Sequence, residues 1–399
     1  MAFWIDTARL ADAQALFGLP PLDRHLRALA RRPAGTRVVL SGPAAGAMRP
    51  EKLAIDVATD TAPFADRLRA ALAASAEPTL VVLDGGSLVD PRLLDMLAEP
   101  GPALVARGGD GDERAAALRL PTADPDIVPD GVDGVDGVAD LADRLLADGA
   151  ATELTADAFP GFVTKLRRHV GFYVVAVPDA ARREARERWL FRSNYKGSTD
   201  LLTRWVYPPL VWPLVRFCTA FRIHPNGVTM LSILLTVAAV PLFAMGQFWS
   251  GLALAYAMSV LDSVDGKVAR LTLTDSRLGD VLDHGLDIVH PPFWYLAWAW
   301  GLSGGDPYSG LVFAGWWLTA FYIGDRLALM VAKWRFGRGL HAMTPLDGAV
   351  RGIIARRNIN LLIFTAGLAA GAPETGFHAV VVWQGVTMLW HIWRTAWVA

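Results

Sequence analysis

The segment DSVDGKVARLTLTDSRLGDVLDHGLD, residues 262–287, decides how the C-terminal half of the chain folds. Four of its aspartates form two pairs, Asp262 with Asp265 and Asp283 with Asp287. Spacings of three and four residues place side chains on one face of a helix. The turn between the two apolar runs is short, so the two acidic faces can converge. Carboxylates this close would repel one another without cations, and oxygen ligands favour Mg²⁺, Mn²⁺ or Ca²⁺.

The acidic pairs lie within apolar sequence. A charge in the bilayer core is costly, so carboxylates inside a membrane usually mark a functional site. A polar seam between helices, or the ion pathway of a transporter, would also place acids there. The acids of this chain concentrate in two adjacent segments, and we find no internal repeat of the kind seen in transporters. This pattern favours a metal site over a transport pathway.

Six apolar segments are long enough to cross a bilayer. They run near residues 227–247, 250–272, 279–303, 308–332, 355–371 and 376–397. The loops at 246–250, 303–309 and 371–376 contain no Lys or Arg, whereas the opposite connections are basic. Excess positive charge marks the cytoplasmic side. We therefore expect a six-helix all-α transmembrane bundle in the inner membrane, with the active site and both termini on the cytoplasmic side.

The N-terminal half has a different composition. In the whole chain, apolar residues make up 53% of the 399 residues and charged residues 19%. The charged fraction is below the roughly 25% that is usual in soluble chains, and the apolar residues are unevenly distributed. Of 15 Trp, only Trp4 precedes Trp189. Strand-like runs at 36–40, 53–57, 79–83, 103–106 and 172–177 alternate with helical runs at 64–74, 91–97 and 138–146. This alternation predicts a soluble α/β domain with a largely parallel sheet.

We divide the chain into three parts on this basis. Residues 1–188 form the cytoplasmic α/β domain, 189–225 a linker with an amphipathic helix in the membrane interface near 205–222, and 226–399 the membrane domain. The N-terminus lacks a basic start followed by an apolar core, so we expect no signal peptide. The repeat at 130–137 could be a metal loop, but it is more typical of an exposed acidic turn.

Charge and cysteine content exclude several functions. The net charge of −1 gives no reason to expect nucleic-acid binding. The single cysteine, Cys218, excludes an intramolecular disulfide and a cysteine metal cage.

The acidic segment resembles the complete signature of the CDP-alcohol phosphotransferase family, D-x2-D-G-x2-A-R-x8-G-x3-D-x3-D. His224-Pro225-Asn226 with Thr229 is similar to the family's entry into its first spanning helix. The resemblance implies two Mg²⁺ or Mn²⁺ ions that grip the CDP diphosphate. It implies these metal ligands: Asp262, Asp265, Asp283 and Asp287.

The same resemblance implies roles for other positions. Asp287 would also act as the catalytic general base for the acceptor hydroxyl, with CMP leaving. The nucleotide-binding candidates are Gly266, Ala269, Arg270, Gly279, Asn226 and Thr229. A homodimer is implied as well.

Two further residues are candidates for binding the acceptor or a phosphate. His284 could do so, or it could be a packing histidine. Arg326 lies inside an apolar run beside Asp325, where an internal ion pair is the alternative. The remaining basic residues around the fourth and fifth segments are typical of contact with anionic lipid.

The N-terminal domain resembles a second family. Residues 79–91 look like the middle strand and metal aspartate of sugar-type nucleotidyltransferases. The layout and the linker 196–200 resemble bifunctional inositol-phosphate cytidylyltransferase/di-inositol-phosphate synthase proteins. The Gly-rich loop that would cradle CTP phosphates has no counterpart, since residues 41–46 contain Pro43 and two alanines. We therefore expect a degenerate, inactive nucleotidyltransferase-like domain.

These observations predict metal-dependent transfer of a phospho-alcohol or phosphatidyl group from a CDP-alcohol to an acceptor hydroxyl, in phospholipid or related polar-lipid synthesis. Two arrangements remain open. A small CDP-linked alcohol could be donated to a lipid, or CDP-diacylglycerol could donate to a polyol or polyol phosphate. The expected partners are the CDP-alcohol donor, a lipid or polyol acceptor, membrane lipids and a second copy of the chain.

Overall fold

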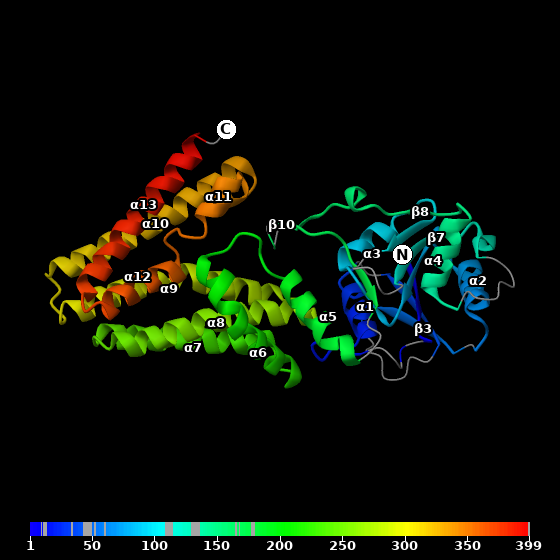
Figure 1. The fold of residues 1–399 in the computed structure, drawn as a ribbon, viewed down its shortest axis with the longest axis horizontal. Helices are drawn as coiled ribbons and strands as arrows, with labels where there is room; N and C mark the ends of the chain where they lie inside the picture. The colour runs from blue at the N-terminus through cyan, green and yellow to red at the C-terminus, as the bar shows by residue number, and fades with distance from the viewer. Residues whose placement is uncertain are drawn as a thin grey trace. The chain divides into compact units, whose positions relative to one another are not determined.

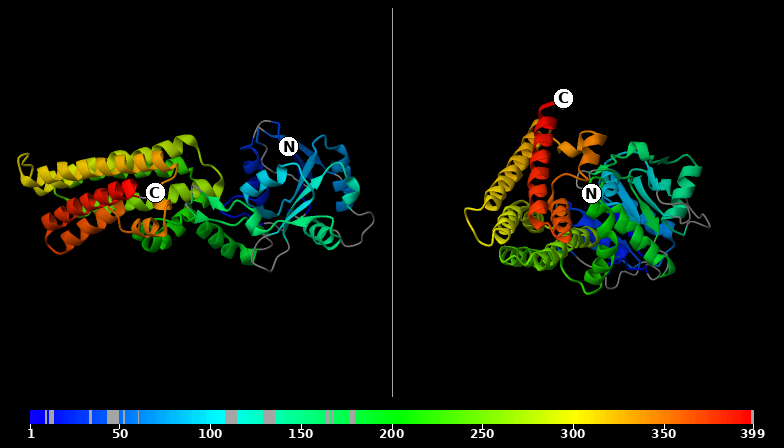
Figure 2. Two further views of the ribbon diagram at one scale, coloured as in Figure 1. Left: turned by 90° about the horizontal axis from the view of Figure 1, so that it is seen from above. Right: turned by 60° about the vertical axis from the view of Figure 1, so that its left-hand side comes forward.

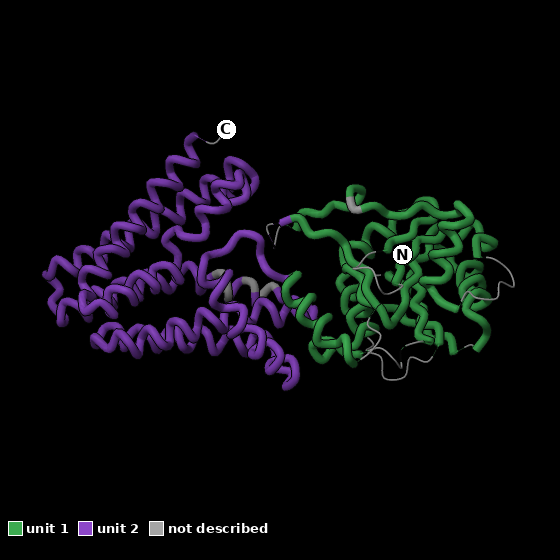
Figure 3. The backbone as a smooth tube through the Cα atoms, viewed as in Figure 1, with its two compact units in different colours: residues 1–163, 169–193 green, residues 164–168, 194–399 purple. Residues whose placement is uncertain are grey.

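The computed structural model describes residues 1–8, 10, 14–32, 35–42, 50–51, 53–59, 61–107, 115–128, 136–163, 166, 168–176 and 180–397. The side chains at 156, 277, 278, 280, 283 and 284 lie outside the described part. The chain divides into two compact units, residues 1–163 with 169–193 and residues 164–168 with 194–399 (Figure 3). An α/β domain is thus followed by a helical domain, as the sequence predicted.

A seven-stranded sheet forms the centre of the first unit, with strand order β3-β2-β1-β4-β7-β6-β8. Four neighbouring strands are parallel: β1 (Ala2–Asp6), β2 (Arg37–Ser41), β3 (Ala54–Ala58) and β4 (Thr79–Asp84). The other three are β6 (Leu104–Arg107), β7 (Ala116–Pro121) and β8 (Thr152–Glu153), and β7 is antiparallel to both β4 and β6. The sheet is therefore mixed, with a parallel half.

Helices cover this sheet (Figure 1). They are α1 (Pro21–Leu29), α2 (Phe64–Ala74), α3 (Pro91–Ala98) and α4 (Val138–Ala147). Trp4 of β1 is almost fully buried in a core with Phe64, and their rings meet edge-to-face at 5.5 Å. Buried aromatic and aliphatic side chains from both layers stabilise the unit through the hydrophobic effect.

The sequence missed part of this topology. The run at 172–177 forms β11 (Val174–Ala176), but it pairs with β5 (Ser87–Val89) outside the main sheet. The short strands β9 (Phe162–Val163) and β10 (Arg168–His169) form a separate ladder. The predicted turn at 130–137 and the loop at 43–46 fall largely outside the described residues.

The second unit is helical. After α5 (Ala180–Ser193) of the first unit come the π-helix η4 (Leu202–Val206) and α6 (Tyr207–Ala220). Six further helices coincide with the six apolar segments: α7 (Pro225–Ala244), α8 (Phe248–Thr272), α9 (Arg277–Leu302), α10 (Gly310–Phe336), α12 (Arg357–Ala369) and α13 (Pro373–Trp397). The short α11 (Pro345–Val350) lies between α10 and α12. The long helices run alongside one another (Figure 2), with α7 against α8 and α9, and α10 against α9 and α13.

Aromatic side chains fill the centre of the bundle. The rings of Trp298 and Phe364 stack at 4.4 Å, and Phe243 meets Trp298 edge-to-face at 5.5 Å. The indole of Trp294 donates a hydrogen bond to the Thr236 carbonyl at 3.0 Å. This core holds α7, α9 and α12 together.

The outer face of the bundle is also apolar. Large exposed side chains include Leu234 and Val237 on α7, Trp316 and Trp317 on α10, and Leu389 on α13. Among the described residues, however, only α7 is both long and apolar enough to cross a membrane. α12 has 13 residues, which span roughly 20 Å of an apolar layer about 30 Å thick. The six-span membrane bundle therefore stays a prediction.

Candidate active site

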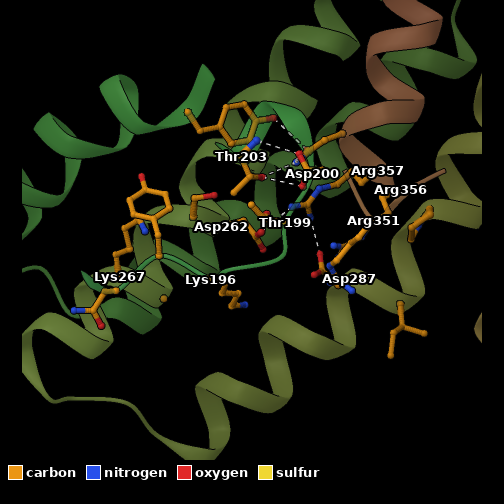
Figure 4. Close-up of a pocket in the computed structure, with 18 of the residues that line it drawn as sticks. Lys196, Thr199, Asp200, Thr203, Asp262, Lys267, Asp287, Arg351, Arg356 and Arg357 are labelled. Atoms are coloured by element: carbon orange, nitrogen blue, oxygen red, sulfur yellow. Dashed lines mark hydrogen bonds and ion pairs between the residues drawn. The ribbon is translucent and has the colours of Figure 1, made fainter. Parts of the chain in front are cut away.

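A polar cavity of about 400 Å³ opens within the second unit. Its walls come from four places in the chain: the linker 194–207, α8, the α9–α10 pair, and the segment 351–358 that leads into α12. Figure 4 shows its labelled residues, with aspartates and arginines facing one another across the cavity. Five residues predicted for the site line it: Asp262, Gly266, Arg270, Asp287 and Arg326.

Asp262 and Asp287 converge on one guanidinium. Arg357, at the start of α12, donates from Nη2 to Asp262 Oδ2 at 2.7 Å and from Nη1 to Asp287 Oδ1 at 2.6 Å. Asp262 lies on α8 and Asp287 on α9, so the two helices do bring these carboxylates together. Asp262 is 19% exposed and Asp287 41% exposed, which leaves Asp287 the more accessible.

Asp265 lies behind this pair rather than in the cavity wall. Its side chain is buried, and Oδ2 accepts a 2.7 Å hydrogen bond from the Thr229 hydroxyl on α7. The structure thus gives Thr229, predicted as a nucleotide contact, a different neighbour: it fixes an aspartate of the signature.

Gly279 and Asn226 also meet. A Cβ on Gly279 would lie 3.1 Å from Asn226 Oδ1 and 3.2 Å from Ser276 Oγ. The missing side chain therefore lets the start of α7 approach the start of α9, where Ser276 caps the helix by accepting from the Gly279 amide at 3.0 Å. Ala269, Gly279, Asn226 and Thr229 are not among the described residues that line the cavity.

The side chains of Asp283 and His284 lie outside the described part of the structure. Their backbone belongs to α9, one turn before Asp287. Their predicted roles stay predictions.

The cavity carries more positive charge than the sequence indicated. Besides Arg270, Arg326 and Arg357, its lining includes Lys196, Lys267, Arg351 and Arg356. Arg351, Arg356 and Arg357 belong to the basic residues near the fourth and fifth segments that the sequence predicted to contact anionic lipid, and the structure places all three in the cavity wall. Arg326 forms the internal ion pair with Asp325 at 2.6 Å and also lines the cavity. Its role in binding the acceptor or a phosphate stays a prediction.

Asp200 is a further lining residue that the sequence did not single out. Its carboxylate accepts from the Thr203 amide at 3.0 Å, the Thr203 hydroxyl at 2.9 Å and Asn358 Nδ2 at 3.0 Å. Burial alone would raise its pKa, but these hydrogen bonds and the charge of Arg356 hold the pKa of Asp200 below its usual value. The linker resemblance at 196–200 was the only signal for it.

The donor set fits a divalent cation in atom type and charge, since two carboxylates from different helices converge on one positive group. Among the side chains that the structure describes, no group of three or more His, Cys, Asp and Glu could hold a metal ion. Arg357 supplies the positive charge between Asp262 and Asp287. A metal bound there would compete with this guanidinium.

Comparison with known proteins gives a family match for most of the second unit. Residues 222–395 match the profile of the CDP-alcohol phosphatidyltransferase family. The matched region includes α7 through α12, most of α13 and all four signature aspartates. The C-terminal half thus carries a domain of the CDP-alcohol phosphatidyltransferase type.

Individual relatives match part of this region. Inner membrane protein YnjF of Escherichia coli (strain K12) is 31% identical over 125 residues, which are 30% of this chain and 58% of that protein. Cholinephosphotransferase 1 of Gallus gallus is 33% identical over 105 residues, 24% of this chain and 31% of that protein. Phosphatidylinositol phosphate synthase of Mycobacterium marinum is 29% identical over 135 residues, 34% of this chain and 50% of that protein. The chain therefore spans less than two thirds of each relative.

Solved structures show weaker likeness. The Mycobacterium tuberculosis phosphatidylinositol phosphate synthase with CDP-DAG bound aligns at 21% identity and a TM-score of 0.39, over 47% of this chain and 94% of that chain. A putative glucose-1-phosphate thymidylyltransferase from Bacillus anthracis aligns at 10% identity and a TM-score of 0.31, over 47% of this chain and 94% of that chain. TM-scores this low do not establish a shared fold.

Proposed function

We propose that the second unit transfers a substituted phosphate group from a CDP-alcohol to an acceptor hydroxyl and releases CMP. The observation that carries the proposal is the convergence of Asp262 and Asp287 on one cationic group in the wall of a polar cavity, inside the region that matches the family. Both residues belong to the signature segment, and the cavity is large enough for a polar head group.

In this mechanism the aspartates at 262, 265, 283 and 287 would hold Mg²⁺ or Mn²⁺, with two ions as the family resemblance implies. A bound divalent metal would neutralise charge on the donor diphosphate and orient it. Asp262 and Asp265 would act as ligands from α8, and the Thr229 hydroxyl holds Asp265 in orientation. With metal on these carboxylates, the Arg357 guanidinium that now pairs with Asp262 and Asp287 would be free to pair with a phosphate.

Asp287 is the proposed general base, as the more exposed carboxylate of the pair. It takes the proton of the acceptor hydroxyl, whose oxygen forms a bond to the phosphorus that carries the donor alcohol. The bond from that phosphorus to the bridging diphosphate oxygen breaks, and CMP leaves with this oxygen. A positioned general base contributes roughly 10²–10⁴-fold to the rate.

The Lys and Arg side chains that line the cavity indicate how much negative charge the substrates carry. A CDP donor brings two phosphates, and the lining offers seven Lys and Arg side chains, several of them already opposed by Asp200, Asp262, Asp287 or the buried Asp325. The seven cations outnumber these four aspartates by three, which is one more than the two phosphates of the donor. This difference supports an additional phosphate on the acceptor, hence a polyol phosphate rather than an uncharged hydroxyl. The name of the Mycobacterium marinum relative, a phosphatidylinositol phosphate synthase, agrees with such a product.

The test is a donor and acceptor panel. Purified full-length protein with Mg²⁺ would be incubated with CDP-diacylglycerol, CDP-choline or CDP-ethanolamine, each with inositol phosphate, glycerol phosphate or a lipid extract. Mass spectrometry would follow CMP and the phosphodiester product. We expect CMP release with one donor class, and more with a phosphorylated acceptor than with its unphosphorylated counterpart. No CMP from any pair would overturn the proposal.

We propose further that the first unit has no cytidylyltransferase activity. At the carboxyl end of its parallel strands, Asp6 of β1 is buried and pairs with Arg67 at 3.2 Å, and Arg67 also donates to the Ser41 hydroxyl at 2.6 Å. The carboxylate at the end of β1 is thus already paired with the protein's own arginine. Pyrophosphate release from CTP and inositol phosphate by the full chain would contradict this assignment.

A further inference from the structure

A buried polar chain runs from the interior of the bundle to the cavity. It begins at His391 on α13, whose Nδ1 contacts Asp325 Oδ1 on α10. Both side chains are completely buried. The other oxygen of the carboxylate, Oδ2, accepts from Arg326 Nη2 at 2.6 Å. Each oxygen of Asp325 therefore has its own partner, one from α13 and one at the cavity wall.

Arg326, at the cavity end of this series of polar contacts, has a second contact. The Arg326 guanidinium carbon lies 5.3 Å from the centre of the Tyr322 ring, one helical turn earlier on α10. The Tyr322 hydroxyl in turn donates to the backbone carbonyls of Asp287 at 3.2 Å and Ile288 at 3.0 Å. These contacts fix the guanidinium relative to the part of α9 that carries the proposed base.

Arg326 retains capacity to bind a ligand. A guanidinium has five N–H donors, and one hydrogen bond to Asp325 is described for it. Its Nε–H is buried and finds no acceptor among the residues that the structure describes. The Arg326 side chain is 31% exposed and lines the cavity, so its remaining N–H groups are suited to the oxygens of an anion such as a phosphate group.

We propose that Asp325, clamped by His391, is a positioning residue for Arg326 and thereby sets the affinity of the cavity for a phosphate group of the substrate. The inference deepens the proposed function and rests on it for the identity of the substrate. Asp325 does not line the cavity, so it acts through Arg326. Holding a long side chain in one rotamer in advance lowers the entropy cost of binding.

The negative charge of Asp325 could also weaken phosphate binding by repulsion, which is the opposite of a positioning effect. If Asp325 acted only through its charge, neutralising it would strengthen phosphate binding, because a repulsive charge would be removed. If it acted only as a polar link between α10 and α13, its loss would lower stability and leave phosphate affinity unchanged. If Asp325 positions Arg326, its loss would weaken phosphate binding. The charge, structural and positioning roles therefore predict tighter, unchanged and weaker phosphate binding, respectively.

The experiment measures binding of inorganic phosphate to the full-length protein in detergent, from the rise of the unfolding midpoint with phosphate concentration. The variants are Arg326→Ala, Asp325→Asn, His391→Leu and the double variant Asp325→Asn with Arg326→Ala. We expect Arg326→Ala to weaken phosphate binding about tenfold, as for loss of a charge-assisted hydrogen bond. Asp325→Asn and His391→Leu should each weaken it severalfold, and Asp325→Asn should add nothing once Arg326 is gone.

Gln384→Leu is the matched control. Gln384 is buried on α13 like His391, and it accepts from Asn360 of α12 at 3.3 Å, away from the cavity lining. This variant should lower the unfolding midpoint without changing phosphate affinity. Unchanged or tighter phosphate binding in Asp325→Asn, or an equal loss with and without Arg326, would overturn the inference. The binding test needs no turnover, so it can fail or succeed independently of the CMP-release panel.

Discussion

At the scale of single residues, the signature aspartates differ in what surrounds them. Asp265 is buried and accepts a hydrogen bond from the Thr229 hydroxyl. Asp262 is partly exposed, and Asp287 is the most exposed of the three described side chains. Their spacing in the sequence, three residues for one pair and four for the other, does not reveal this difference in exposure. The exposure of the three carboxylates is greatest at Asp287, which is the proposed base.

Substitution of these residues should separate their roles. Asp262→Ala should abolish CMP release and metal-dependent nucleotide binding, since a ligand is lost. Asp287→Asn should lower kcat by about 10²–10⁴-fold with a smaller effect on donor binding. Initial rates and equilibrium binding of CDP would measure both. The control is Asp306→Asn in the exposed loop before α10, which should retain wild-type rates; wild-type activity in Asp262→Ala would contradict the assignment.

His25 makes the first unit sensitive to pH. Its ring lies buried in α1 with Nε2 2.9 Å from the Ser87 carbonyl, and burial lowers its pKa from 6.5 to about 4. Between these values the unfolded chain binds a proton that the folded chain does not, so stability falls as pH falls from about 6.5 toward 4. Hydrogen exchange of β4 and α1, corrected for intrinsic rates, should show this loss. His25→Gln should flatten the dependence, and substitution of the exposed His169 should not.

At the scale of helices and strands, the sequence located most elements but not their partners. Periodicity and apolar length predicted the helices of the second unit and strands β2, β3, β4 and β6. β7 was missed because Ala116–Leu118 are buried without alternation, so the run lacks the period of two on which strand prediction depends. Arg357 was missed because its contact with Asp262 joins residues 95 positions apart.

Arg357 should control how the acidic helices respond to metal. In Arg357→Gln, Asp262 and Asp287 lose their shared counter-charge, so the unfolding midpoint without metal should fall. Added Mg²⁺ or Mn²⁺ should then raise the midpoint more than in wild type, because the ion no longer competes with a guanidinium. Arg338→Gln, outside the cavity lining, is the control. An equal metal response in Arg357→Gln and wild type would argue against metal binding between α8 and α9.

Gly301 allows the end of α9 to approach α7. A Cβ there would lie 2.0 Å from the Phe243 carbonyl oxygen, whereas Gly285 on the same helix has open space. Gly301→Ala should destabilise the bundle by roughly 1–3 kcal/mol through overpacking. Gly285→Ala should be neutral or stabilising by about 0.5–1 kcal/mol, since a helical glycine is replaced. Thermal unfolding in detergent would compare them, and equal midpoints would show that the two helices can separate without cost.

At the scale of the whole molecule, the two units differ in the location of their apolar side chains. The first buries them around a mixed sheet, whereas the second exposes Trp, Leu and Val on its outer helices and buries polar groups such as Asp325, Asn360 and Gln384. That distribution suits a bundle in lipid with an interior polar site. The composition of the two halves and the length of the apolar segments predicted this contrast. Residue spacing could not show that linker residues and three arginines complete the cavity.

The most direct test is the initial rate of CMP release by the purified full-length chain, with a CDP-alcohol donor and a polyol phosphate acceptor. The proposed chemistry predicts release that requires Mg²⁺ or Mn²⁺, stops with EDTA, resumes when metal is restored, and is absent in Asp262→Ala but retained in Asp306→Asn. CMP release that persists in Asp262→Ala, or no release with any donor in the presence of metal, would contradict it.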